Sequence, residues 1–444
     1  MGFGAMIARH FALEARGSDL RTEILAGTTT FLTMAYIVIV NPAILSQAGM
    51  PVAGVAAATC LAAALASVLM GLIADVPLAM APGMGLNAYF AFTVVQGMHV
   101  PWPVALACVF LAGALFLLLT LAGIRQMIVA AIPPHLFAAV AAGIGLFIGE
   151  IGLRNAGIIV SSPATGVALG DLHAPGALLA LAGLVLVAAL QAGRVRGAIL
   201  IGIVATTAAA WLLGTVRFAP QPYDLAALGA TALKLDFGGV FAGMSAGHGA
   251  GMVEVLFVFL FVGLFDNLGT LMAVTRQAGM VAGDGTIPRL DRMLVADSLG
   301  AMIGAAAGTS TVCSYVESAA GVEAGGRTGL AAVVTGLLFL LAMLAAPYAG
   351  LVPVAATAPA LILVAAQMMA PLAEIRWSEA EDAIPAFLTL AGIPLTFSIA
   401  NGLAIGLTAH AAIRLARGRI TRRDGLLLVL AAAFVARFAW LSAT

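Results

Sequence analysis

Stretches of about twenty apolar residues recur along most of this chain, and each is long enough to cross a bilayer. Of the 444 residues, 62% are hydrophobic and only 9% are charged, whereas soluble domains are about one quarter charged. Twenty basic and twenty acidic residues cancel, which argues against nucleic acid as a partner. The sequence therefore predicts an all-α polytopic membrane protein.

We expect fourteen transmembrane segments, several of them short or broken by Gly and Pro. The longest polar interruption, residues 215–250, separates seven segments from seven, so the two halves would insert with opposite topology as inverted repeats. Lys and Arg are retained on the cytoplasmic side of membrane proteins. With a cytoplasmic N-terminus, only Arg154, Arg217 and Lys234 fall outside, and Arg437 is not assigned. This pattern predicts a multi-pass protein of the inner (cytoplasmic) membrane.

The two ends of the chain differ from the rest. Residues 1–24 are charged and amphipathic without the apolar core and cleavage site of a signal peptide, so we expect a cytoplasmic helix there. The apolar run from Leu426 to Trp440 contains Arg437 and either lies in the membrane interface or packs as a fifteenth helix; the interface is the favoured interpretation.

Spacing of Cys and His residues predicts neither a disulfide framework nor a metal site, and no cofactor is expected.

One polar stretch, residues 309–329, interrupts the apolar pattern of the second half with hydroxyls, glycines and the carboxylate of Glu317. Irregular polar backbone survives in hydrocarbon only where it is buried in protein or lines a cavity. An ionisable residue at such a place is a functional candidate by default. We therefore expect Glu317, with the neighbouring hydroxyls of Ser310 and Thr311, to contribute to a substrate site at mid-membrane.

Asp266 lies near the middle of the eighth apolar segment, where a carboxylate is costly unless it faces a polar interior. We interpret it as a substrate or proton site. Asn87 follows Gly83 and Gly85 in the third segment, and it either contacts a ligand or hydrogen-bonds one helix to another.

Other carboxylates have structural explanations. Glu150 and Arg154 are spaced for an i, i+4 ion pair, and Asp297 is expected at the N-terminus of the ninth segment.

Two carboxylates and few cations indicate what such a site binds. Buried acids accept hydrogen bonds from N–H groups and exchange protons, which suits a planar heterocycle and disfavours an anion such as sulfate. Phe31, Phe90 and Tyr315 offer faces for stacking. The sequence has no nucleophile–base or metal constellation, so an enzyme is not expected. Residue chemistry alone identifies the substrate only as a small solute that bears N–H groups.

Several long motifs closely resemble the AzgA-like purine permeases of the nucleobase–cation symporter 2 (nucleobase–ascorbate transporter) superfamily. They are Thr28–Pro42, Ala81–Phe90, Leu264-Phe-Asp266, Gly308–Gly321 and Gly325–Gly329. The resemblance covers nearly the whole chain. It implies proton-coupled uptake of adenine, guanine or hypoxanthine by elevator-like alternating access, short strands in segments three and ten, and a homodimer through a gate domain. It assigns Asp266 and Glu317 to substrate binding and proton coupling, and Asn87 and Tyr315 to substrate binding.

The resemblance also divides the chain. It implies a cytoplasmic N-terminus (1–24), a core domain (25–124 and 251–348), a gate domain (125–214 and 349–417), an external loop (215–250) and a basic, apolar tail (418–444).

This chain departs from the family at Gly263 and Asn267, where an acid and a hydroxyl are usual. We expect Asp266 and Glu317 to suffice for binding, with Gly263 enlarging or neutralising the pocket. The alternatives are a pyrimidine or xanthine permease, or an uncoupled or anion transporter of the same fold.

Overall fold

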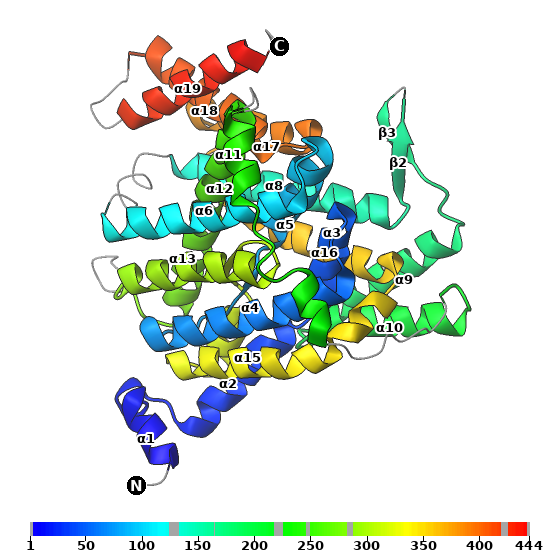
Figure 1. The fold of residues 1–444 in the computed structure, drawn as a ribbon, viewed down its shortest axis with the longest axis vertical. Helices are drawn as coiled ribbons and strands as arrows, with labels where there is room; N and C mark the ends of the chain where they lie inside the picture. The colour runs from blue at the N-terminus through cyan, green and yellow to red at the C-terminus, as the bar shows by residue number, and fades with distance from the viewer. Residues whose placement is uncertain are drawn as a thin grey trace.

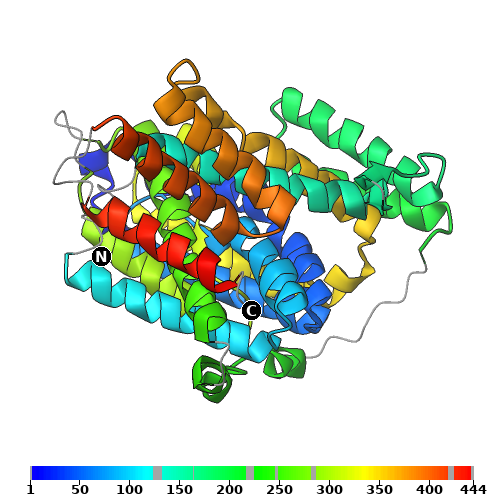
Figure 2. The ribbon, with the colours of Figure 1, turned by 90° about the horizontal axis from the view of Figure 1, so that it is seen from above.

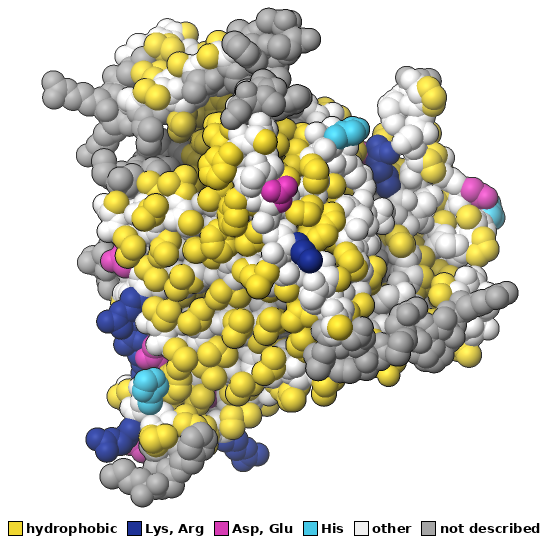
Figure 3. Space-filling view, in the orientation of Figure 1, with side chains coloured by type: hydrophobic (Ala, Val, Ile, Leu, Met, Phe, Trp, Pro, Cys, Tyr) yellow, Lys and Arg dark blue, Asp and Glu magenta, His cyan; other side chains and the backbone are white. Residues whose placement is uncertain are grey.

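Long helices lie side by side through most of the computed structural model, which describes residues 3–123, 133–163, 165–216, 225–245, 249–281, 287–418 and 425–441. In this described part, nine helical segments are long and apolar enough to cross a membrane. Figure 3 shows a face that is mostly hydrophobic, with most of its charged side chains gathered at the edge near the N-terminal helix. An apolar belt between charged edges is what a bilayer-spanning bundle requires.

The helices of the first half are α1 (Phe3–His10), α2 (Leu20–Met34), α3 (Ile37–Leu45), α4 (Val52–Ile73), α5 (Met84–Ala88), α6 (Trp102–Leu121), α8 (Pro134–Asn155), α9 (Pro175–Ala192) and α10 (Ala198–Leu212). Those of the second half are α11 (Phe237–Ser245), α12 (Gly249–Gln277), α13 (Leu290–Ala307), α14 (Ser318–Glu323), α15 (Gly329–Ala342), α16 (Val354–Gln367), α17 (Ala380–Thr396), α18 (Ile399–Ala416) and α19 (Gly425–Leu441). A π-helix, η3 (Tyr89–Gly97), continues α5.

The helices pack as two groups. In one, α6, α13, α4 and α15 follow each other as successive rows, with α2, α12 and α14 packed on them (Figure 1). In the other, α8, α9, α10, α16, α17 and α18 pack together, as the view from above also shows (Figure 2). Helices from the two halves of the chain alternate within the rows. Glycines allow this closeness, because a side chain on Gly329 would overlap the backbone of Gly71.

Two short strands from distant parts of the chain form an antiparallel ribbon inside the first group. β1 (Met80–Pro82) pairs with β4 (Val312–Ser314), with Met80 opposite Ser314. In hydrocarbon every backbone N–H and C=O needs a partner within the protein. The Ser67 hydroxyl accepts from the Met80 N–H at 2.9 Å and donates to the Met80 carbonyl at 3.0 Å, and Asn267 Oδ1 accepts from the Ser314 N–H at 3.2 Å. Side chains from α4 and α12 therefore close the outer edges of the ribbon.

A second ribbon, β2 (Ile159–Ser162) with β3 (Gly166–Leu169), follows α8 and is mostly exposed. Its neighbour Arg154 forms the expected ion pair with Glu150, at 2.8 Å. The prediction of that pair is confirmed.

Two carboxylates of the first half cap the helix α15 of the second half. Fully buried Glu23 accepts from the N–H of Arg327 at 2.9 Å and of Ala331 at 3.2 Å. Asp75 accepts from the N–H of Gly329 at 2.9 Å. The first N–H groups of a helix have no partner within it and attract negative charge. Glu23 and Asp75 therefore tie the two halves together at one end of the first helix group.

Asp75 also binds two guanidinium groups, those of Arg16 at 2.6 Å and Arg289 at 2.8 Å. We predict that Asp75→Ala lowers the free energy of unfolding by about 1–2 kcal/mol, because it leaves these donors and the α15 N-terminus without their acceptor. Thermal unfolding of purified protein measures this. Asp171→Ala is the control, since the Asp171 side chain is 74% exposed. Equal melting temperatures for the two variants would contradict the assigned role of Asp75.

Two expectations need correction. Asp297 does not open its helix: α13 begins at Leu290, so Asp297 lies within the helix, where it is buried. The interruption at 215–250 is also more structured than a loop. It contains a 3₁₀ turn at Leu225–Ala230 and the helix α11, which packs on α6 and α12.

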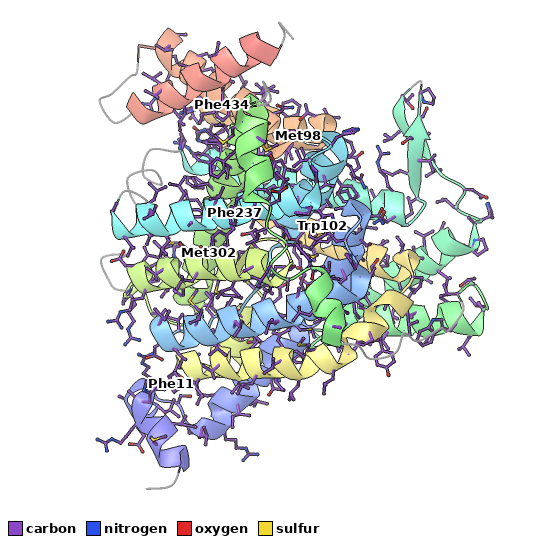
Figure 4. The ribbon with its side chains drawn as sticks, in the orientation of Figure 1. Phe11, Met98, Trp102, Phe237, Met302 and Phe434 are labelled. Carbon is purple, nitrogen blue, oxygen red and sulfur yellow. The ribbon has the colours of Figure 1, made fainter. Side chains whose placement is uncertain are left out.

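The C-terminal apolar run forms α19, which packs on the bundle. Its residues Leu427, Ala431 and Phe434 are buried, and α18 is its main neighbour. Phe434, labelled in Figure 4, meets Phe257 of α12 edge to face, with ring centroids 5.5 Å apart. These contacts favour a further packed helix over the interfacial placement that we expected.

Candidate functional site

Glu317 lies shortly after the end of β4 and is the N-cap residue of α14. It is half-buried, and its Oε1 accepts a hydrogen bond from the Tyr36 hydroxyl at 2.7 Å. Its backbone carbonyl accepts from the Thr33 hydroxyl at 3.4 Å. Tyr36 and Thr33 both belong to the first apolar segment. The structure thus holds Glu317 between the ribbon and the break that separates α2 from α3.

Tyr315 is buried and fixed to the opposite strand of the ribbon. Its N–H donates to the Ala79 carbonyl at 3.0 Å, and its hydroxyl donates to the Pro82 carbonyl at 2.5 Å. Thr311 is held similarly, because its carbonyl accepts from the N–H of Gly83 at 3.0 Å. These bonds set the register between β1 and β4, and the hydroxyl bond fixes the end of the Tyr315 ring at Pro82.

Asp266 lies in α12, and its side chain is outside the described residues. The next residue, Asn267, is fully buried and accepts from the backbone N–H of Ser314 in β4. This contact brings the backbone of α12 at Asp266 against the strand that leads to Glu317. The approach of the two acidic side chains to each other remains a prediction.

Asn87 belongs to a buried hydrogen-bond network that joins the first three apolar segments to the polar stretch at residues 309–329. Its Nδ2 donates to Asn41 Oδ1 at 2.5 Å, and its Oδ1 accepts from the Ser310 hydroxyl. Asn41 in turn donates to Thr59 at 2.7 Å and to Thr309 at 2.8 Å. Asn87 and Ser310 are fully buried. This arrangement supports the second of the two interpretations of Asn87, a link between helices.

We predict that Asn87→Ala lowers the free energy of unfolding by about 1–3 kcal/mol, because it leaves buried groups of Asn41 and Ser310 without a partner. Thermal unfolding with and without a purine separates the two interpretations of Asn87. If the residue is a structural link, the ligand raises the melting temperature of the variant as much as that of the wild type. Gln96→Ala is the control, since Gln96 is an exposed amide. If the variant melts at the wild-type temperature without purine, and the purine no longer raises that temperature, Asn87 is a ligand contact.

The two phenylalanines expected as stacking faces each pack against another aromatic ring. Phe31 is half-buried and meets Phe339 edge to face, with centroids 5.1 Å apart. Phe90 is fully buried against Phe259, with centroids 6.4 Å apart. Of the two, only Phe31 retains an accessible ring surface. Its role as a stacking face stays a prediction.

The structure gives Gly263 an apolar setting. A Cβ there would lie 3.4 Å from the Phe116 ring and 3.7 Å from Leu86, which is ordinary contact. A charged side chain at this position would therefore meet apolar groups of α6 and α5. Compared with the acid that is usual in the family, Gly263 leaves this position uncharged and smaller.

Sequence reasoning missed Tyr36 as a partner of Glu317, Ser67 and Asn267 as partners of the ribbon, and Asn41 as a partner of Asn87. Tyr36 and Asn41 both lie inside the motif Thr28–Pro42, and a polar group in an apolar segment needs a partner, so the signal was present. The sequence does not show which residues of different segments lie close enough to form a hydrogen bond. Among the described residues, no group of three or more His, Cys, Asp or Glu side chains could hold a metal ion.

Comparison with known proteins gives consistent results. Residues 21–405 match the Permease family (Xan_ur_permease). The chain is 41% identical to the adenine permease AdeP of Escherichia coli, over 99% of this chain and 97% of AdeP. It is 44% identical to the guanine/hypoxanthine permease PbuG of Bacillus subtilis, over 97% of this chain and 99% of PbuG.

Among solved structures, the transmembrane domain of a cyanobacterium bicarbonate transporter, BicA, has a similar fold. The TM-score is 0.67 at 17% sequence identity, and the match covers 86% of this chain and 97% of that domain. At this identity the likeness concerns the fold alone.

Proposed function

The chain belongs to the Permease family and is a multi-pass membrane transporter rather than an enzyme, and we propose that it imports purine nucleobases by proton symport. Adenine, guanine and hypoxanthine are the candidate substrates, because the relatives AdeP and PbuG are named for them. The observation that carries the proposal is the position of Glu317. A carboxylate at the end of a buried ribbon, beside a helix that carries a second acid, suits a solute with several N–H groups.

In this proposal the base lies near the ribbon with its N–H edges on Glu317 and Asp266. Tyr315 and Phe31 supply apolar faces, and the ends of β1 and β4 near Ser310 and Thr311 close the pocket. A carboxylate in a low-dielectric site changes its proton affinity when a ligand binds or leaves. Protonation of Asp266 or Glu317 would therefore couple the movement of the base to the proton gradient.

Transport requires that the site open to either side in turn. We assign the ribbon, α2 to α6 and α12 to α15 to a core that moves, and α8 to α10 with α16 to α18 to a gate, in an elevator-like motion. The two packing groups support this division. Direct bonds between the groups include one from the Thr93 hydroxyl to the Phe397 carbonyl at 2.6 Å.

The same proposal includes fourteen segments in seven-plus-seven inverted halves, a cytoplasmic N-terminus in the inner membrane, and a homodimer through the gate. The pairing of β1 with β4, each followed by a short helix, supports the repeat. Seven segments in each half reverse the direction of insertion.

We predict that Glu317→Ala lowers uptake of labelled hypoxanthine by about tenfold or more at equal membrane abundance, because it removes a carboxylate that accepts N–H groups of the base. Uptake by cells that lack their own purine carriers measures this. Glu150→Ala is the matched control, since Glu150 pairs with Arg154 in the gate. Wild-type uptake by the Glu317→Ala protein would show that the site is assigned wrongly.

We predict that cells concentrate labelled purine above the external level and that a protonophore abolishes this accumulation, because a gradient drives the uphill step. Counterflow of labelled purine against unlabelled purine persists without the gradient. Accumulation that survives the protonophore would exclude proton symport. Competition by uracil or xanthine that exceeds competition by adenine, guanine and hypoxanthine would favour the pyrimidine or xanthine alternative.

A further inference from the structure

We propose that Tyr36 is a positioning residue for substrate binding: its hydroxyl fixes the carboxylate of Glu317 in the orientation that receives an N–H group of the base. The proposal rests on the proposed function, because it takes Glu317 as a contact of the purine. It adds a second residue of the first apolar segment, besides Phe31, to the proposed site. The following contacts carry it.

A break in the first segment places Tyr36. Helix α2 ends at Met34 and α3 begins at Ile37, so Ala35 and Tyr36 form the junction. Around the junction the N–H of Val38 bonds to the Ala35 carbonyl at 3.2 Å and that of Ile39 to the Tyr36 carbonyl at 3.1 Å, a tighter turn than the α-helix. The change of winding turns the Tyr36 ring toward α14.

The phenol is deeply buried. Tyr36 is 1% exposed and belongs to the main apolar core, yet its hydroxyl reaches Glu317 Oε1 at 2.7 Å. A buried tyrosine hydroxyl needs a partner, and a bond to a carboxylate is stronger and more directional than one between neutral groups. A hydrogen bond at one oxygen restricts the rotation of a carboxylate. The bond to Tyr36 therefore helps to set the direction in which the Glu317 carboxylate points.

The backbone around the pair is rigid as well. A side chain on Gly321 would overlap the Thr30 hydroxyl and the Ala26 carbonyl, so α14 and α2 lie in close contact. The Thr33 hydroxyl also reaches the backbone carbonyl of Glu317. Tyr36 and Glu317 thus adjoin two closely packed helices, α2 and α14. A change at the Tyr36 hydroxyl acts on the carboxylate rather than on the placement of the helix.

Binding to purified full-length protein tests this role. We expect Tyr36→Phe to raise the Kd for labelled hypoxanthine, adenine or guanine about tenfold, which corresponds to about 1.4 kcal/mol. In uptake assays at equal abundance the same variant raises KM by a similar factor and keeps Vmax within about twofold, because the loss concerns binding geometry. Tyr348→Phe is the matched control: it removes the same hydroxyl from a tyrosine that is 54% exposed, and it leaves Kd unchanged within about twofold.

A double-mutant cycle shows whether Tyr36 acts through Glu317. In a Glu317→Ala protein, the added Tyr36→Phe change should alter Kd by less than about twofold, because the side chain that Tyr36 positions is gone. An unchanged Kd for Tyr36→Phe alone, or an equal loss in both backgrounds, overturns the proposal while leaving the proposed function standing. If the wild type binds none of the three purines, the proposed function fails and this inference fails with it.

Discussion

Unpaired backbone polar groups cannot remain in hydrocarbon, and the candidate site depends on how this chain meets that constraint. Two strands of three residues each have few partners of their own. Ser67 closes the outer edge of β1, Asn267 closes that of β4, and the Ser318 hydroxyl accepts from the N–H of Ala79 at 3.0 Å. Because those side chains come from α4, α12 and α14, the ribbon is held from several sides. The strand that leads to Glu317 therefore has a fixed place in the bundle.

The two halves of the chain complete each other at the same ribbon and beyond it. Glu23 and Asp75 of the first half cap α15 of the second half. Asn41 and Asn87 of the first half bond to Thr309 and Ser310 of the second half. Such cross-connections join the helices around the ribbon into one unit. The elevator proposal requires such a unit to move as a body relative to α8, α9, α10 and α16 to α18.

The sequence predicted a large part of this arrangement. Apolar runs and the broken segments around Asn87 and Glu317 are local signals, and periodicity and composition reveal them. The resemblance to purine permeases rested on long motifs and identified the family correctly. The Glu150–Arg154 pair followed from spacing alone.

The rest depends on contacts between residues far apart in the chain. The bond of Tyr36 to Glu317 spans 281 positions and that of Asn41 to Thr309 spans 268, and neither leaves a local pattern. Asp297 was misplaced because its helix begins earlier than its apolar run, at Leu290. The short length of the C-terminal run and its Arg437 favoured the interface, whereas Leu427 and Phe434 are buried against the bundle.

Binding of the base beside the ribbon is the central claim, and labelling of one introduced cysteine tests it most directly. Val316 lies between Tyr315 and Glu317 and is 49% exposed, whereas the native Cys60, Cys108 and Cys313 are buried. In a background with those cysteines replaced by alanine, a maleimide should modify Val316→Cys, and hypoxanthine, adenine or guanine should slow the reaction in proportion to its occupancy. Sulfate should have no effect. A labelling rate that saturating purine leaves unchanged, in a protein that still transports purine, would contradict the account.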